Sequence, residues 1–314
     1  MVCSTLLVEN FTGKWVILLL FYGILLMADS VGSVGRFLAG GKEFLAAAGV
    51  ETPGTDAEWL MAAVLRRRRG ELALHLDDPL SGEQRRRWHG LLEKRAERIP
   101  LQHVLGTAPF GDLTLAVDDS VLIPRPETEE LIYLLATSPA PRPPRTILDL
   151  GTGSGACILA LGKAFPEAIL AACDCDGAAL AVARKNAGAC GLGSRVNFVL
   201  SDWFDSLAGR WDLIVSNPPY LTEEEWAAAE PEVRRHEPRL ALVGGGRDGT
   251  ACLEKIIGAA EKFLQPSGTL ALEMGVEQGE KLKKFAESRG LTRVKILRDL
   301  AGRERFLFAR RDGD

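Results

Sequence analysis

Trp211-Asp212-Leu213-Ile214-Val215-Ser216-Asn217-Pro218-Pro219-Tyr220 joins a short apolar run to a polar tetrad. The apolar run predicts a buried strand. Two consecutive prolines cannot donate to a sheet ladder, so the strand must end before them. In open α/β sheets, ligands bind at the carboxyl ends of the strands, where this tetrad would lie. The stretch therefore predicts an α/β fold with a ligand site at residues 217–220.

The tetrad suits a planar group that carries an NH2. The side-chain oxygen of Asn217 and the carbonyl of Pro218 can accept its two N–H bonds, and Tyr220 can stack on its face. For an Asn-Pro pair alone, a strand-ending turn is the better explanation. The complete tetrad after an apolar strand, together with the glycine loop described next, favours a binding site.

Strands and helices alternate after residue 146, which predicts a mostly parallel sheet with helices on both faces. The predicted strands are 146–150, 168–173, 196–200, 212–216, 269–274, 294–297 and 305–309, the last two an antiparallel pair that closes the sheet. The predicted helices are 156–165, 176–189, 252–264 and 278–288.

A tight glycine loop, Gly151-Thr152-Gly153-Ser154-Gly155, follows the first of these strands. Glycines allow a sharp turn and the close approach of a ligand, and such loops serve both dinucleotides and S-adenosylmethionine. Asp174 ends the next strand and is placed to accept the hydroxyls of a ribose, although it could also cap a helix. Asp202 and Trp203 follow the third strand and offer a polar contact and an aromatic wall for an adenine, although Trp203 could also be a core residue.

Methyl transfer is favoured over hydride transfer. A dinucleotide enzyme needs a second phosphate-binding pattern and a proton donor near the nicotinamide, and nothing after Asp174 supplies either. The tetrad at 217–220 instead provides acceptors for an amide or an aromatic amine. Together these residues resemble the class I S-adenosylmethionine-dependent methyltransferases, whose fold is a Rossmann-like, mostly parallel seven-stranded sheet.

Several motifs narrow the resemblance to the peptide chain release factor glutamine N5-methyltransferases (the HemK/PrmC type). In chain order they are Val121-Leu122-Ile123-Pro124-Arg125-Pro126-Glu127-Thr128-Glu129, Asp149 to Gly155, Ser201-Asp202-Trp203-Phe204, Ser216 to Tyr220, Glu237-Pro238 and Asp248-Gly249. The resemblance covers about residues 31–311. The Ile-Pro-Arg-Pro segment is its most specific part.

The resemblance implies methylation of the glutamine side-chain amide in the Gly-Gly-Gln loop of class 1 release factors, with S-adenosyl-L-methionine as cofactor. The tetrad alone would also fit an adenine-N6 nucleic-acid methyltransferase, and a binding module with a degenerate cofactor site is a third reading. The implied catalytic residues are Asn217, Pro218 and Tyr220, and the implied substrate site is 217–220, including Pro219. The implied cofactor residues are Gly151, Thr152, Gly153, Ser154, Gly155, Asp174, Asp202, Trp203 and Asn217.

Four segments are expected: an apolar extension at 1–26, a helical substrate-recognition domain at 27–106, a β-hairpin with a Pro-rich linker at 107–145, and the methyltransferase domain at 146–314. The hairpin is expected between residues 110 and 123, with its turn at Asp118-Asp119-Ser120. In the helical domain, Thr55 or Asp56 is a candidate N-cap. The arginines at 66–69 and 85–87 are either a solvated helix face or a docking face for an acidic or RNA-associated partner.

The apolar run from Trp15 to Met27 is too short to span a bilayer comfortably. No clean small-x-small cleavage site follows it. The run could be the core of a signal peptide or a membrane anchor, but we expect translation to begin at Met27, and no membrane association if residues 1–26 are not translated.

The net charge of −4 argues against a generally nucleic-acid-coating surface, so no stable nucleic-acid binding is expected. The six cysteines and four histidines show neither a paired Cys-x-x-Cys pattern nor a zinc site. These features predict reduced cysteines and a cytoplasmic, monomeric enzyme without a metal.

Overall fold

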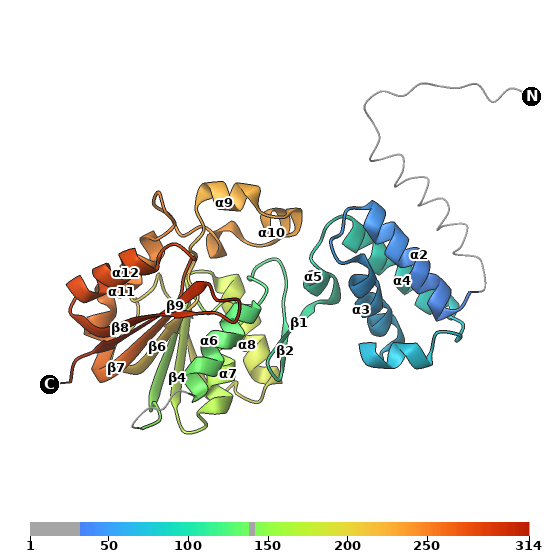
Figure 1. The fold of residues 1–314 in the computed structure, drawn as a ribbon. Coiled ribbons are helices and arrows are strands. Elements are labelled where there is room, and N and C mark those ends of the chain that lie inside the picture. Colours follow the sequence, from blue (N-terminus) through green and yellow to red (C-terminus); the bar gives the residue numbers. More distant parts are fainter. Residues whose placement is uncertain (1–31, 138–141, 314) are drawn as a thin grey trace, which may run out of the picture. The chain divides into compact units, whose positions relative to one another are not determined.

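The computed structural model describes residues 32–137 and 142–313 (Figure 1). The expected extension at 1–26, the start at Met27 and residues 138–141 of the expected linker lie outside the described residues. The chain divides into two compact units, Met1–Leu105 and Gly106–Asp314, and each is described separately. Within the described ranges, each helix is too short or too polar to cross a bilayer.

The first unit is helical, which confirms the predicted N-terminal helical domain. Its elements are α2 (Val34–Ala47), α3 (Pro53–Leu65), the 3-10 helix η1 (Arg69–Leu74), α4 (Gly82–Ala96) and α5 (Leu101–Leu105). Helix α4 begins at a capping box, because the Ser81 hydroxyl accepts from the Gln84 amide and the Gln84 side chain accepts from the Ser81 amide. Leu45, Leu60 and Trp88 are among the fully buried side chains of its core.

A buried ion pair connects two helices of this unit. The structure corrects the expectation that Thr55 or Asp56 caps α3, because the helix begins at Pro53 and Asp56 lies inside it. The Asp56 carboxylate accepts from Nε of Arg95 at 2.6 Å, and both residues are buried. Arg95 also donates to the carbonyl of Ile99. The pair therefore links α3 to α4 and to the segment that follows α4.

Replacing Asp56 with alanine removes the carboxylate from a buried guanidinium. Breaking a buried pair in this way costs about 3–5 kcal/mol, so we expect urea denaturation of Asp56→Ala to show a loss of that size in the free energy of unfolding. Glu58→Ala is the matched control, because Glu58 lies on the same helix and pairs with Arg69 on the surface. Exposed pairs contribute about 0–1 kcal/mol. Equal losses in the two variants would contradict a special role for the buried pair.

The second unit contains a seven-stranded sheet in the order β5-β4-β3-β6-β7-β9-β8. The strands are β3 (Thr146–Leu150), β4 (Ile169–Asp174), β5 (Val196–Leu200), β6 (Trp211–Ser216), β7 (Leu264–Glu273), β8 (Leu291–Arg298) and β9 (Glu304–Arg311). Strands β3 to β7 are parallel, and β9 pairs antiparallel with both β7 and β8. The predicted mostly parallel sheet with a closing antiparallel pair is confirmed.

Helices cover both faces of this sheet (Figure 1). They are α6 (Pro126–Thr137), α7 (Ala156–Ala164) and α8 (Gly177–Ala189) on one face, and α11 (Ala251–Phe263) and α12 (Gly279–Ser288) on the other. Ile147 of β3 packs into the first core and its neighbour Leu148 into the second. Because successive side chains of a strand point to opposite faces, a strand covered on both sides is apolar at most positions. This explains the continuous apolar runs in the sequence.

The predicted hairpin is present, but it lies earlier in the chain than expected. Strand β1 (Thr107–Phe110) pairs with β2 (Leu113–Ala116), so the chain turns at Gly111 and not at residues 118–120. Gly111 has a φ of +56°, a conformation that glycine adopts without strain. Val121 and Ile123 do not form a strand. They pack in a small apolar cluster with residues of α8.

Candidate active site

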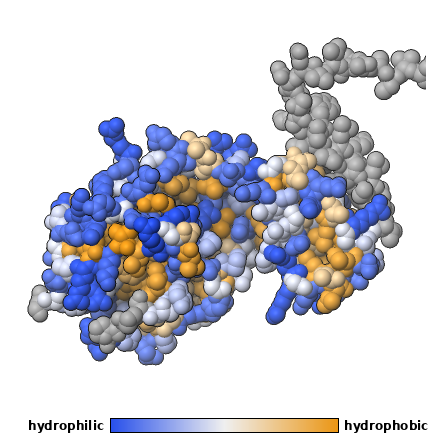
Figure 2. Space-filling model, viewed as in Figure 1, coloured by the Kyte–Doolittle hydropathy of each residue, from blue (hydrophilic) through white to orange (hydrophobic). Residues whose placement is uncertain are grey.

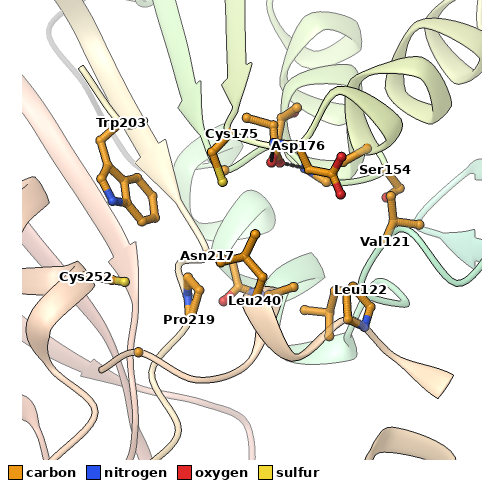
Figure 3. Close-up of a pocket in the computed structure, with 18 of the residues that line it drawn as sticks. Val121, Leu122, Ser154, Cys175, Asp176, Trp203, Asn217, Pro219, Leu240 and Cys252 are labelled. Atoms are coloured by element: carbon orange, nitrogen blue, oxygen red, sulfur yellow. Dashed lines mark hydrogen bonds between the residues drawn. The ribbon is translucent and has the colours of Figure 1, made fainter. Parts of the chain in front are cut away.

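A cavity of about 490 Å³ lies at the carboxyl ends of the central strands (Figure 3). Gly151 follows β3, Asp174 ends β4, Ser201 follows β5 and Asn217 follows β6, and all four line the cavity. From β3 the chain moves outward to β4 and β5, then returns to β6 on the other side of β3. Ligands of open α/β sheets bind at such a switch point.

The glycine loop forms one wall of the cavity. Gly151 and Gly153 have φ values of +67° and +53°, which side chains rarely adopt. A Cβ on Gly151 would lie 3.4 Å from the Trp203 ring, whereas a Cβ on Gly153 would meet nothing within 4 Å. The Thr152 hydroxyl turns inward and donates to the buried Asp149 carboxylate at 2.6 Å. Burial raises the pKa of Asp149 to about 7, although this hydrogen bond lowers it.

Asp174 is held beside this loop by two backbone amides. Its Oδ2 accepts from the Gly153 amide at 2.9 Å, and its Oδ1 accepts from the Asp176 amide at 3.0 Å. Burial raises the pKa of Asp174, while these amides lower it. A carboxylate oxygen can accept two hydrogen bonds, so each oxygen of Asp174 can accept one more, from a ligand hydroxyl. The cap of α8 is Asp176, which accepts from the Ala178 amide.

The loop after β5 forms a second wall of the cavity, next to Gly151. Trp203 lines the cavity and has a left-handed backbone, with φ of +52°. A hydrogen bond from the Ser201 hydroxyl to the Trp203 carbonyl stabilises this conformation. The exposed Asp202 side chain also lines the cavity, but its carboxylate is paired with Lys255 at 2.7 Å. Sequence reasoning missed Lys255, Cys175 and Cys252, which also line the cavity. Figure 3 labels the two cysteines.

The tetrad is divided between the cavity and the protein interior. Asn217 and Pro219 line the cavity, whereas Pro218 is buried, and neither Pro218 nor Tyr220 is among the lining residues. The Tyr220 hydroxyl donates to Oε1 of Glu273 at 3.0 Å. Burial and the Glu273 carboxylate raise the pKa of Tyr220 well above its ordinary value, so this hydroxyl stays protonated.

The segment after the tetrad folds back on it. This segment contains α9 (Glu223–Ala228), α10 (Pro231–His236) and the 3-10 helix η2 (Arg239–Ala241). The amides of Tyr220 and Leu221 both donate to the carbonyl of Leu242. A Cβ at Gly244 would collide with the Pro219 carbonyl, so only glycine allows this close return.

Two motifs noted in the sequence meet next to the cavity. The Arg125 guanidinium donates to both carboxylate oxygens of Glu237, at 2.7 and 2.9 Å. Burial raises the pKa of Glu237, and the positive charge of Arg125 counteracts that shift. The pair anchors the segment before α6 to the loop after α10, and both segments line the cavity.

Sequence reasoning also missed roles for Thr128 and Glu273. Asn217 Nδ2 donates to the Thr128 hydroxyl at 2.9 Å, and that hydroxyl donates to Oε2 of Glu273 at 2.6 Å. Thr128 belongs to the motif at residues 121–129 and lies in α6, whereas Glu273 ends β7. An acid at the carboxyl end of a predicted strand was the available signal for Glu273.

The residues around the cavity fit S-adenosylmethionine. The volume falls within the range of about 300–1,000 Å³ that is common for small-ligand pockets. Glycine backbone faces open space at Gly153, Asp174 presents acceptors for a ribose, and Trp203 supplies an aromatic surface. Asn217 also lines this cavity and presents an amide group to it (Figure 3).

Asp174→Ala should weaken S-adenosylmethionine binding by about 10- to 100-fold, because hydrogen bonds to a charged group contribute about 1.5–3 kcal/mol. Isothermal titration calorimetry measures this change directly. Asp205→Ala is the control, because Asp205 is exposed and does not line the cavity. Unchanged affinity in Asp174→Ala would rule out the ribose contact.

Comparison with known proteins assigns both units to described families. Residues 37–106 match the family described as PrmC N-terminal domain, and residues 128–235 match the one described as Methyltransferase small domain. The crystal structure of a methyltransferase from Pyrococcus furiosus superposes with a TM-score of 0.51 at 20% identity, covering 70% of this chain and 99% of that chain. That likeness supports the fold alone.

Curated relatives align over most of the chain. A release factor glutamine methyltransferase from Cereibacter sphaeroides is 43% identical over 266 residues, which are 85% of this chain and 94% of the relative. One from Thermosynechococcus vestitus is 44% identical over 241 residues, which are 75% of this chain and 81% of the relative. The resemblance noted in the sequence is thus confirmed, and the chain belongs to the family of release factor glutamine methyltransferases, which are S-adenosylmethionine-dependent enzymes.

Proposed function

We propose that this protein transfers a methyl group from S-adenosylmethionine to the side-chain nitrogen N5 of the glutamine in the Gly-Gly-Gln motif of class 1 release factors. This transfer would modulate translation termination. The observation that carries the proposal is the Asn217 side chain. It lines the cavity and donates its amino group to Thr128, so its oxygen is available to accept from a substrate N–H.

The proposed mechanism addresses the low reactivity of an amide nitrogen, whose lone pair is delocalised into the carbonyl. S-adenosylmethionine supplies an electrophilic methyl group on a sulfonium when it is bound. The Asn217 oxygen would accept one amide N–H bond and raise the electron density on nitrogen. The Pro218 carbonyl as second acceptor and Tyr220 as support of the amide plane are proposed from their chemistry alone, because neither residue lines the cavity. Positioning can lower such a barrier by up to about 7–11 kcal/mol. As the new N–C bond formed, the methyl–sulfur bond would break, S-adenosylhomocysteine would be the leaving group, and the amide proton would pass to water.

The helical unit is the proposed binding site for the release factor. Its arginines at 66–69 are exposed, as are Arg86 and Arg87 on α4, so they are accessible to an acidic or RNA-associated partner. We further propose that the enzyme works as a cytoplasmic monomer, because its substrate functions in translation. The name of the relatives, release factor glutamine methyltransferase, supports the release factor as the substrate.

Incubation with labelled S-adenosylmethionine tests the substrate. We expect label on a release factor and on a peptide with its Gly-Gly-Gln motif, and none on DNA or RNA. A release factor in which that glutamine is replaced with glutamate is the control, and it should stay unlabelled. Label on nucleic acid, with none on the peptide, would overturn the proposal and favour adenine-N6 methylation.

Asn217→Ala should lower kcat by about 10²–10³-fold, the loss seen when one polar group of a charge-stabilising site is removed. Calorimetric affinity for S-adenosylmethionine should change much less than in Asp174→Ala. Steady-state rates at saturating cofactor distinguish the two variants. Near-normal kcat in Asn217→Ala would refute the amide clamp.

A further inference from the structure

A chain of four polar side chains runs from the cavity into the protein interior. Asn217 Nδ2 donates to Thr128 Oγ1 at 2.9 Å, and Thr128 Oγ1 donates to Glu273 Oε2 at 2.6 Å. Tyr220 donates to the other oxygen of Glu273. Glu273 has no exposed surface and Thr128 is 4% exposed, so the surroundings leave these groups few alternative partners.

The direction of each hydrogen bond follows from the number of protons. Thr128 Oγ1 donates to Oε2 of Glu273 and the Tyr220 hydroxyl donates to Oε1, so each oxygen of Glu273 acts as an acceptor. A threonine hydroxyl has one proton, and that of Thr128 is used on Glu273. Towards Asn217 the hydroxyl can therefore only accept. The NH2 end of the Asn217 amide must face Thr128, and its oxygen must point away from Thr128.

Both carboxylate oxygens of Glu273 accept hydrogen bonds from neighbouring hydroxyls. Burial raises the pKa of Glu273, whereas the hydroxyls of Thr128 and Tyr220 and the positive charge of Arg305 lower it. The Arg305 guanidinium lies 5.8 Å from the centre of the Tyr220 ring and donates to the carbonyl of Met274. Glu273 thus has two hydroxyl donors and a nearby buried cation.

The opposite orientation of Asn217 would be unfavourable. Its oxygen would then lie against the Thr128 oxygen, with no proton between the two acceptors. The amino group would instead face the substrate and would select a carbonyl or carboxylate in place of an amide N–H. The orientation of the Asn217 amide therefore decides whether it binds the N–H or the carbonyl of a substrate amide.

We propose that Thr128 and Glu273 are positioning residues that hold the Asn217 amide with its oxygen toward the substrate nitrogen. The proposal rests on the proposed function, because glutamine is the substrate whose N–H that oxygen would accept. Through Thr128, the motif at residues 121–129 would orient Asn217, which lies 89 positions later in the chain.

Kinetics of three variants test this role. Thr128→Val keeps the shape and removes the hydroxyl, and we expect it to lower kcat by about 10- to 100-fold while KM for S-adenosylmethionine stays within about twofold. Thr128→Ser restores the hydroxyl and should recover kcat to within about threefold of wild type. Thr137→Val is the control, because Thr137 lies on the same helix but is exposed. Wild-type kcat in Thr128→Val, or an equal loss in Thr128→Ser, would overturn the proposal.

A second measurement needs no substrate. The side-chain NH2 signal of Asn217 in ¹⁵N-labelled full-length protein, assigned by its loss in Asn217→Ala, should exchange slowly with water in the wild type and in Thr128→Ser. It should exchange at least about tenfold faster in Thr128→Val, because the amino group loses its acceptor. Equal exchange in all three proteins would overturn the proposal. A wild-type enzyme that leaves glutamine unmethylated would refute the proposed function, while this signal still reports the orientation.

Discussion

Two prolines end β6 at the centre of the sheet, and the geometry of the site depends on this interruption. Since neither proline can donate to a ladder, the chain leaves the sheet directly after Ser216. It does so beside β3, at the point where the strand order reverses. Asn217 therefore lines the cavity next to the glycine loop, because Ser216 and Leu150 are partners in the sheet.

Buried carboxylates at this edge of the sheet fix the orientation of the side chains around the site. Asp149 accepts from Thr152 of the glycine loop, Glu237 pairs with Arg125, and Glu273 accepts from Thr128 and Tyr220. A buried carboxylate without donors is costly, so each of these groups constrains the hydroxyl or guanidinium that satisfies it. The cost of burial is thus what gives the surrounding side chains a single orientation.

Each unit has a buried apolar core of its own. Figure 2 shows hydrophilic surface interrupted by smaller hydrophobic areas on both units. The helical unit has its own core around Trp88 and its own buried ion pair between Asp56 and Arg95. Its stability and that of the catalytic unit therefore rest on separate sets of contacts.

Local patterns in the sequence were sufficient for the element types and for the place of the site. Apolar runs, the glycine loop and the Pro-Pro pair each act within a few residues, so they predicted the parallel sheet and the location of Asn217 and Asp174. The turn of the hairpin was misplaced, because Asp118-Asp119-Ser120 and Gly111 are both good turn formers and register is decided by packing.

Contacts between distant segments came from the tertiary structure. Asp56 resembles a helix cap until Arg95 is seen beside it. Thr128 and Glu273 are 145 residues apart, and they meet because α6 packs on the sheet that β7 belongs to. The sequence by itself determined which strand ends would hold polar groups. Strand order and helix packing decided which of those groups form hydrogen bonds with one another. The reason is that a hydrogen bond requires a donor and an acceptor about 3 Å apart, and spacing along the chain does not specify that distance.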